Sequence, residues 1–265
     1  MSATIGHRRR RRRTTGVPGS DASVVFGVDE VDMARKGAHK PATKSTPIPG
    51  APDRRRRAVM AGHSKDGVLS ANDAAEWAVS DPSPEVRAAS LSALWRTGAL
   101  PGELLLGAFE DESPKVRRRA CDLAGRLLNT GDEALWCQLV NALIAALRDP
   151  DSLVAETSAW ALGEVGPDER RISGTTALES LCRTARSHPD PLCRESAVAA
   201  LGALGDPRGL GAILDALDDR PAIRRRAAVA LAPFDDRRAD DALRRCLEDR
   251  DWQVRQVAEE LLADR

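Results

Sequence analysis

The stretch DESPKVRRRACDLAGRL, residues 111–127, combines a helix start with an amphipathic helix. Serine and proline stand before its first turn, where side-chain oxygens accept hydrogen bonds from free amides and proline is tolerated. Val116, Ala120 and the pair Leu123 and Ala124 then recur at offsets that fit one face of an α-helix. A small residue in this stripe predicts a close approach to a neighbouring helix.

The same pattern occurs six times along the chain. The copies start at residues 81, 111, 149, 188, 218 and 249, with the sequences DPSPEVR, DESPKVR, DPDSLVA, HPDPLCR, DDRPAIR and DRDWQVR. A second amphipathic segment precedes each copy, for example GELLLGAFE at residues 102–110. Neither helix of such a pair can bury its stripe alone, and stacking on a neighbouring pair buries it. The sequence therefore predicts an all-α protein, a right-handed α-solenoid of about six helix pairs over residues 66–265.

The final copy departs from one apolar column. Ten positions after each start the residues are Leu91, Cys121, Ala159, Val198, Ala228 and Glu259. A terminal repeat needs a polar outer face because no neighbour covers it. We expect Glu259 to be exposed and the sixth repeat to act as a C-terminal cap.

The repeat resembles a known family. Its motif, Asp-x-x-x-x-Val-Arg followed by Ala-x-x-Ala-Leu-Gly, is best preserved in CRESAVAALGALGDPRG at residues 193–209. This is similar to HEAT repeats, in particular the short bilin-lyase-like (E/Z-type) HEAT repeats, and the resemblance covers about residues 66–265. It departs from the motif at Ala155, in place of the arginine, and at His188, in place of the aspartate, so that Arg194 lacks its aspartate.

The resemblance implies roles for two sets of residues. In HEAT repeats the aspartate and the arginine six residues later form a hydrogen-bond ladder between neighbouring repeats, and rigid guanidinium donors suit that role. This assigns to the ladder Asp81, Arg87, Asp111, Arg117, Asp218, Arg224, Asp249 and Arg255. The second helices of HEAT-like repeats commonly line the concave face. The candidate partner-binding residues on these helices are therefore Trp95, Arg118, Asp122, Glu156, Trp160 and Arg225. The alternatives are a merely solvated charged face at Arg118 and packing of Trp160 under the loop of residues 166–174.

Residues 1–65 have a different composition. They are rich in Arg, Pro, Gly, Ser and Thr and hold 15 basic but five acidic residues, which leaves 25 basic and 35 acidic residues after them. Because the segment has few large apolar residues, it can bury too little apolar surface to offset the loss of conformational entropy, and we expect a disordered basic arm. Deletion of residues 1–60 should therefore leave the body folded. Met33 and Met60 are alternative starts to Met1. The arginine runs of the arm have two interpretations: they bind nucleic acid electrostatically, or they form a solvated tail without a specific partner. These runs are Arg8, Arg9, Arg10, Arg11, Arg12, Arg13, Arg54, Arg55, Arg56 and Arg57.

Enzyme families with this type of repeat find little support. Deoxyhypusine hydroxylase binds iron through His-Glu pairs, whereas none of the four histidines here precedes a glutamate. Bilin lyases share the repeat, and nothing beyond the repeat supports that activity. Alkylpurine DNA glycosylases use tryptophan and aspartate in a basic groove. Trp160, Trp136 and Asp122 are residues of these types, but the positions expected to line the concave face are not basic overall. We expect no catalytic residue, no cofactor and no metal site.

The sequence thus favours a non-catalytic scaffold that binds a protein partner through the concave face. The runner-up is association with nucleic acid through the arm. Five scattered cysteines without a C-x-x-C predict small apolar core residues in a reducing compartment, and hence a cytoplasmic protein. No apolar run approaches the length of a membrane span, and we expect a monomer.

Overall fold

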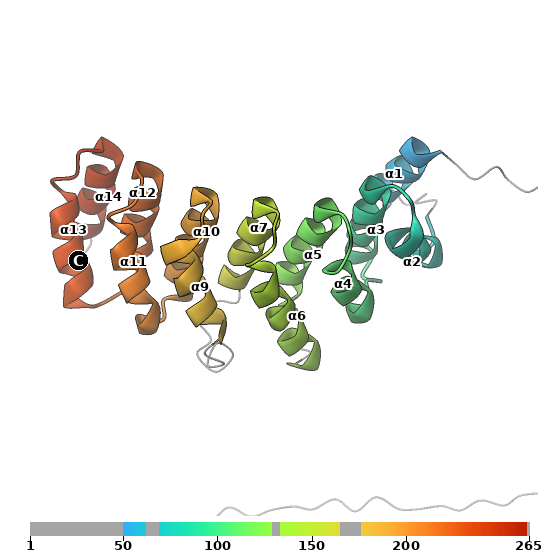
Figure 1. Cartoon of the computed structure of the whole chain (residues 1–265), viewed down its shortest axis with the longest axis horizontal. Helices are drawn as coiled ribbons and strands as arrows, with labels where there is room; N and C mark the ends of the chain where they lie inside the picture. The colour runs from blue at the N-terminus through green and yellow to red at the C-terminus, as the bar shows by residue number, and fades with distance from the viewer. Residues whose placement is uncertain (1–49, 62–68, 129–132, 165–175, 264–265) are drawn as a thin grey trace, which may run out of the picture. The chain divides into compact units, whose positions relative to one another are not determined.

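The computed structural model describes residues 50–61, 69–128, 133–164 and 176–263. In these ranges the chain forms thirteen α-helices, one short 3-10 helix at Pro207–Gly209 and no strand. Twelve of the helices form six consecutive pairs that stack in chain order (Figure 1). The predicted all-α solenoid of six helix pairs is confirmed.

Each pair consists of a first and a second helix. The first helices are α2 (Ala71–Ser80), α4 (Gly102–Ala108), α6 (Glu133–Ala146), α9 (Thr176–Ser187), α11 (Leu210–Ala216) and α13 (Arg237–Cys246). The second helices are α3 (Pro84–Arg96), α5 (Pro114–Leu127), α7 (Ser152–Gly163), α10 (Pro191–Leu204), α12 (Pro221–Ala230) and α14 (Trp252–Ala263). Each second helix contacts the next one along the chain, so that they form one continuous layer.

The second helices begin as their sequences predict. Proline occupies the first turn of α3, α5, α10 and α12, and Asp151 and Asp190 accept hydrogen bonds from first-turn amides of α7 and α10. The apolar residues five positions and the small residues nine positions after each start are all buried. The pair at twelve and thirteen is buried in five repeats and half-buried in the last, at Leu261 and Leu262. Glu259 is exposed, as predicted.

Glycine sets how closely successive second helices approach. A Cβ on Gly163 of α7 would lie 2.9 Å from Cα of Ala200 on α10, and a Cβ on Gly202 would lie 2.8 Å from Cα of Ala230 on α12. Real Cβ atoms do not come so close to backbone, so these glycines are required by packing. Gly205, which ends α10, has a positive φ of 63°, a backbone conformation that favours glycine.

An additional helix, α1 (Ala51–Met60), precedes the six pairs, and it corrects the predicted boundary. The arm was expected to be disordered to residue 65, whereas α1 packs on α3 with Ala58 fully buried. Arg96 of α3 donates hydrogen bonds to the carbonyl oxygens of Ala61 (3.0 Å) and Ala58 (2.8 Å), which caps the C-terminal end of α1. α1 is therefore the first described helix of the repeat array, and it contacts α3 as one second helix contacts the next. Residues 1–49 lie outside the described residues.

All five cysteines are free thiols. Cys121, Cys182, Cys193 and Cys246 are buried, as expected of small apolar core residues, whereas Cys137 is exposed on α6. Among the described helices, none is long and apolar enough to cross a membrane.

Candidate functional site

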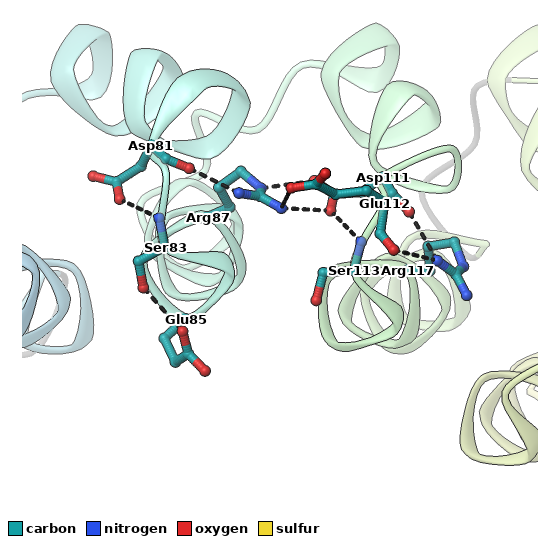
Figure 2. Close-up of polar contacts among 8 residues, drawn as sticks. All are labelled: Asp81, Ser83, Glu85, Arg87, Asp111, Glu112, Ser113 and Arg117. Carbon is teal, nitrogen blue, oxygen red and sulfur yellow. Dashed lines mark hydrogen bonds and ion pairs between the residues drawn. The ribbon is translucent and has the colours of Figure 1, made fainter.

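The arginines of the second helices join neighbouring repeats. Arg87 of α3 donates two parallel hydrogen bonds to the carboxylate of Asp111 in the next repeat, both of 2.8 Å, and a third to the backbone carbonyl oxygen of Asp81 (2.8 Å) (Figure 2). Its side chain is 6% exposed. The Asp111 carboxylate also accepts a hydrogen bond from the Ser113 amide. One guanidinium thus holds its own loop and the next.

The same arrangement, which we call a rung, recurs along the array. Further rungs join Arg54 to Asp81, Arg117 to Asp149, Arg194 to Asp219, and Arg224 to Asp249. Three of these differ from the sequence assignment. Asp149, to which no ladder role was assigned, is the partner of Arg117. Asp219, rather than Asp218, is the ladder carboxylate of its repeat, and it provides Arg194 with the partner that the sequence did not assign. Arg54 belongs to the ladder rather than to an electrostatic arm.

The ladder has one interruption and one open end. Between the third and fourth repeats, Ala155 replaces the arginine and His188 replaces the carboxylate that this arginine would contact, so both departures fall on one rung. His188 keeps part of the aspartate's role, because its Nδ1 accepts a hydrogen bond from the Asp190 amide (3.1 Å). At the sixth repeat, Arg255 donates to the Asp249 carbonyl oxygen (2.7 Å), and no described carboxylate contacts its guanidinium.

The rungs shift the acid–base properties of their members. Hydrogen bonds from Arg194 and Arg224 lower the pKa of the Asp219 and Asp249 carboxyls, and outweigh the opposing effect of burial. In return, the hydrogen bond to Asp111 raises the pKa of Arg87. The ladder is therefore fully ionised at neutral pH.

A groove opens on the second helices at the N-terminal part of the array. Fourteen positions after the start, repeats two to four carry a glycine that contacts a small residue of the next helix, as Gly125 contacts Ala161. The first repeat carries Trp95 at this position, and Leu123 of α5 occupies the position that the small residue has in the other repeats. These two side chains line a groove of about 410 Å³ between α1, α3 and α5. The bulky pair in place of glycine and alanine explains why a groove exists here.

The groove carries more cationic than anionic groups. Arg55, Arg96, Lys115, Arg119 and Arg126 line it, together with two acids, Glu85 and Asp122. Lys115 pairs with Glu85 (2.5 Å), and Asp122 pairs with both Arg119 (2.8 Å) and Arg126 (3.2 Å).

An aromatic face lies beside these charges. The Arg126 guanidinium lies 5.3 Å from the centre of the Trp95 ring, within the range of a cation–π contact. Trp95 is half-buried. The groove therefore presents an aromatic side chain surrounded by excess positive charge.

Of the six partner-binding candidates, the structure brings two together in this groove, Trp95 and Asp122. Arg118 is exposed on α5 outside it, and Glu156 is half-buried on α7. Trp160 is 43% exposed, and its ring would lie 3.5 Å from a Cβ atom placed on Gly125 of α5. Arg225 donates a hydrogen bond to Gln253 of the next second helix.

Several groove residues escaped the sequence analysis. Arg119 is the residue after the candidate Arg118, and Arg126 lies four residues after the candidate Asp122. Arg55 was assigned to the arm. The signal that could have revealed the groove is the tryptophan in a column otherwise held by glycine and alanine. Of the arm arginines, Arg55, Arg56 and Arg57 are exposed on α1, while Arg8 to Arg13 lie outside the described residues.

Two features bear on the enzyme alternatives. In the described part of the chain, no group of three or more His, Cys, Asp and Glu side chains is arranged to hold a metal ion. Trp136 belongs to the first helix α6, whereas Asp122 and Trp160 lie on the second helices α5 and α7.

The fold and the ladder define an α-solenoid of helix-pair repeats, and sequence comparison identifies the type. The family model for HEAT repeats matches residues 102–187 and 178–263. The chain belongs to the HEAT repeat family, which confirms the resemblance drawn from its motif.

Individual relatives are more distant. The chain is 36% identical over 74 residues to deoxyhypusine hydroxylase from Neurospora crassa, a match that spans 28% of this chain and 21% of that protein. Among solved structures, a designed armadillo repeat protein in complex with the peptide (KR)4 has a TM-score of 0.55 at 16% identity and covers 74% of this chain and 99% of its own. The complex of CpcE and CpcF of phycocyanin lyase from Nostoc sp. PCC7120 has a TM-score of 0.46 at 20% identity, over 61% of this chain and 97% of that one.

Proposed function

We propose that this protein is a binding module without catalysis of its own, which holds an acidic segment of a partner protein in the groove between α1, α3 and α5. The observation that carries the proposal is the aromatic and cationic lining of that groove, in which Arg126 lies over the half-buried ring of Trp95. Tryptophan and arginine are the side chains most often responsible for binding energy at protein interfaces.

The charge of the groove supports an acidic partner. Its five cationic and two anionic side chains leave an excess of positive charge, although the chain after residue 65 is acidic as a whole. An Asp- or Glu-rich segment would compete with Asp122 for Arg119 and Arg126, and it would find Arg55 exposed. An apolar side chain of the segment would pack on the ring of Trp95.

A structural neighbour supports the use of this kind of fold for peptides. The designed armadillo repeat protein with a TM-score of 0.55 was solved in complex with a peptide of alternating lysine and arginine. Complementarity of charge decides which segments such a surface accepts. A basic groove therefore favours a segment of the opposite charge.

The test is a binding titration with fluorescent peptides that are rich in Asp and Glu and contain one leucine. Two variants, Trp95→Ala and Arg119→Gln with Arg126→Gln, should each weaken binding about tenfold or more. The control is Arg118→Gln, an exposed arginine on the same helix outside the groove, which should leave the affinity within about twofold. Equal affinities of all variants, or no preference for acidic over neutral peptides, would overturn the proposal.

The exposure of Arg55, Arg56 and Arg57 on α1 favours a second candidate, association with nucleic acid. Such binding is driven by the release of counterions and falls steeply with salt. A titration with duplex DNA of arbitrary sequence at rising salt separates the two candidates. Strong, salt-dependent DNA binding that is lost when all three arginines become Gln, with no peptide binding, would favour this alternative.

A further inference from the structure

We propose that the interrupted rung between the third and fourth repeats forms a binding site for a small molecule that bears a phosphate or carboxylate group. The site is separate from the groove of α1, α3 and α5, and the proposal stands independently of the function proposed for that groove.

A cavity of about 520 Å³ lies at this place in the array. Its walls are α6, α9 and the two loops that lead into α7 and α10, at residues 148–152 and 187–190. The volume falls within the range of about 300–1,000 Å³ that is usual for pockets of small ligands.

The absence of the ladder arginine accounts for the cavity. In an intact rung the guanidinium lies between the backbone carbonyl of its own loop and the carboxylate of the next, as Arg87 lies between Asp81 and Asp111. The corresponding residues at the interrupted rung are Asp149 and His188, and both line the cavity. The methyl group of Ala155 is too short to reach the space between them.

The cavity is lined by two arginines and two aspartates, and both aspartates already accept hydrogen bonds from other groups. Asp149 is occupied by two hydrogen bonds from Arg117, and Asp190 accepts hydrogen bonds from the Leu192 amide and the Ser152 side chain. Arg148 and Arg183 also line the cavity, and their guanidinium groups have no partner among the residues that the structure describes. Two arginines without partners on one cavity favour an anionic ligand.

The surroundings add to this preference. The N-terminal ends of α7 and α10 border the cavity at Ser152 and Asp190, and helix N-termini carry partial positive charge. Ile144 and Leu147 provide apolar lining, and Thr184 of α9 also lines the cavity. The ligand therefore combines an anionic group with an apolar body.

Thermal unfolding of the full chain in the presence of two probes, inorganic phosphate and glutarate, tests the proposal, with sodium chloride at matched ionic strength as the baseline. A ligand that binds the folded state raises Tm in a saturable manner. We expect at least one probe to do so. Phosphate alone indicates a phosphate-bearing ligand, and glutarate alone indicates a carboxylate-bearing ligand.

The variant Arg148→Gln with Arg183→Gln should weaken the response about tenfold or more, because both charged donors are removed. Arg118→Gln, an exposed arginine without a described partner elsewhere, is the matched control and should respond as the unchanged protein does. Because Arg148 and Arg183 are both exposed, their replacement leaves the core intact, which circular dichroism verifies. No saturable response to either probe, or an equal response in the double variant, would overturn the proposal.

Discussion

The adjacent arginines Arg117 and Arg118 have the same charge and different surroundings. The Arg117 side chain is 15% exposed and donates to the Asp149 carboxylate and to two loop carbonyls. Arg118, the next residue along the helix, is exposed. Position relative to the stripe, rather than residue type, separates a structural arginine from a surface one.

Replacement of these two residues should have unequal effects. Arg117→Ala leaves the Asp149 carboxylate and two carbonyl groups without their donor and should lower the free energy of unfolding by about 1–3 kcal/mol. Arg118→Ala removes a solvated charge and should change it by no more than about 0.5 kcal/mol. Urea denaturation of both variants measures the difference, and equal midpoints would refute the assignment of Arg117 to the ladder.

Thiol reactivity provides a second test at this scale. Burial raises the pKa of Cys121 to about 12 and that of Cys193 to about 11, so neither forms appreciable thiolate at neutral pH. Cys137 is exposed. A thiol reagent should therefore modify one cysteine rapidly in the native protein, and Cys137→Ser should abolish that phase. Rapid modification of Cys121 in the folded state would contradict its burial.

The sequence predicted residues of the ladder well where spacing alone decides. It failed at Asp218 because Asp218 and Asp219 are adjacent carboxylates, and the choice between them depends on the path of the loop. It also treated Ala155 and His188 as two separate departures. That both positions belong to one rung could be recognised only once Arg117 was seen to contact Asp149 in the next repeat.

At the scale of elements, α1 is the main departure from the prediction. Its sequence, APDRRRRAVM, contains four arginines and no apolar stripe, which is why its composition indicated disorder. The helix is held by polar contacts at both ends: Arg54 contacts Asp81, and Arg96 contacts the carbonyls of its last turn. Such contacts come from distant residues and leave no local sequence pattern.

Two truncations test the role of α1. Removal of residues 1–49 should leave Tm unchanged, because every described helix of the array remains. Removal of residues 1–60 exposes the face of α3 that α1 covers, and it should lower Tm by at least about 3 °C. Differential scanning calorimetry compares the two proteins with the full chain. If both truncated proteins unfold at the temperature of the full chain, α1 is not part of the array and the boundary at residue 65 was correct.

The interrupted rung allows a test by restoration. Ala155→Arg alone places a cation beside His188, and His188→Asp alone places a carboxylate in the loop without its partner, so each should destabilise the protein. The double variant rebuilds the pair found in the other rungs, and its stability should exceed the sum of the single effects by about 1 kcal/mol or more. Additive effects in chemical denaturation would show that the ladder geometry does not extend to this position.

For the whole molecule, the ladder predicts how stability depends on pH. The pKa values of Asp219 and Asp249 are lower in the folded state than in the unfolded chain. Their contribution is therefore complete above the unfolded value of about 4 and is lost as pH falls through the lower folded values. Tm should be nearly constant from about pH 8 to 5 and should fall below about pH 4. A variant with Arg194→Gln and Arg224→Gln should show a smaller fall, and an equal fall would contradict the coupling.

The central claim is that these rungs join one repeat to the next across the array. A double-mutant cycle on Arg87 and Asp111, the pair in Figure 2, tests it most directly. Arg87→Ala, Asp111→Ala and the double variant are compared by equilibrium denaturation, and the cycle cancels the loss of the Ser113 hydrogen bond, which both Asp111 variants share. We predict a coupling free energy of about 1–3 kcal/mol. A coupling below about 0.3 kcal/mol would mean that the two residues contribute independently and that the ladder does not join the repeats.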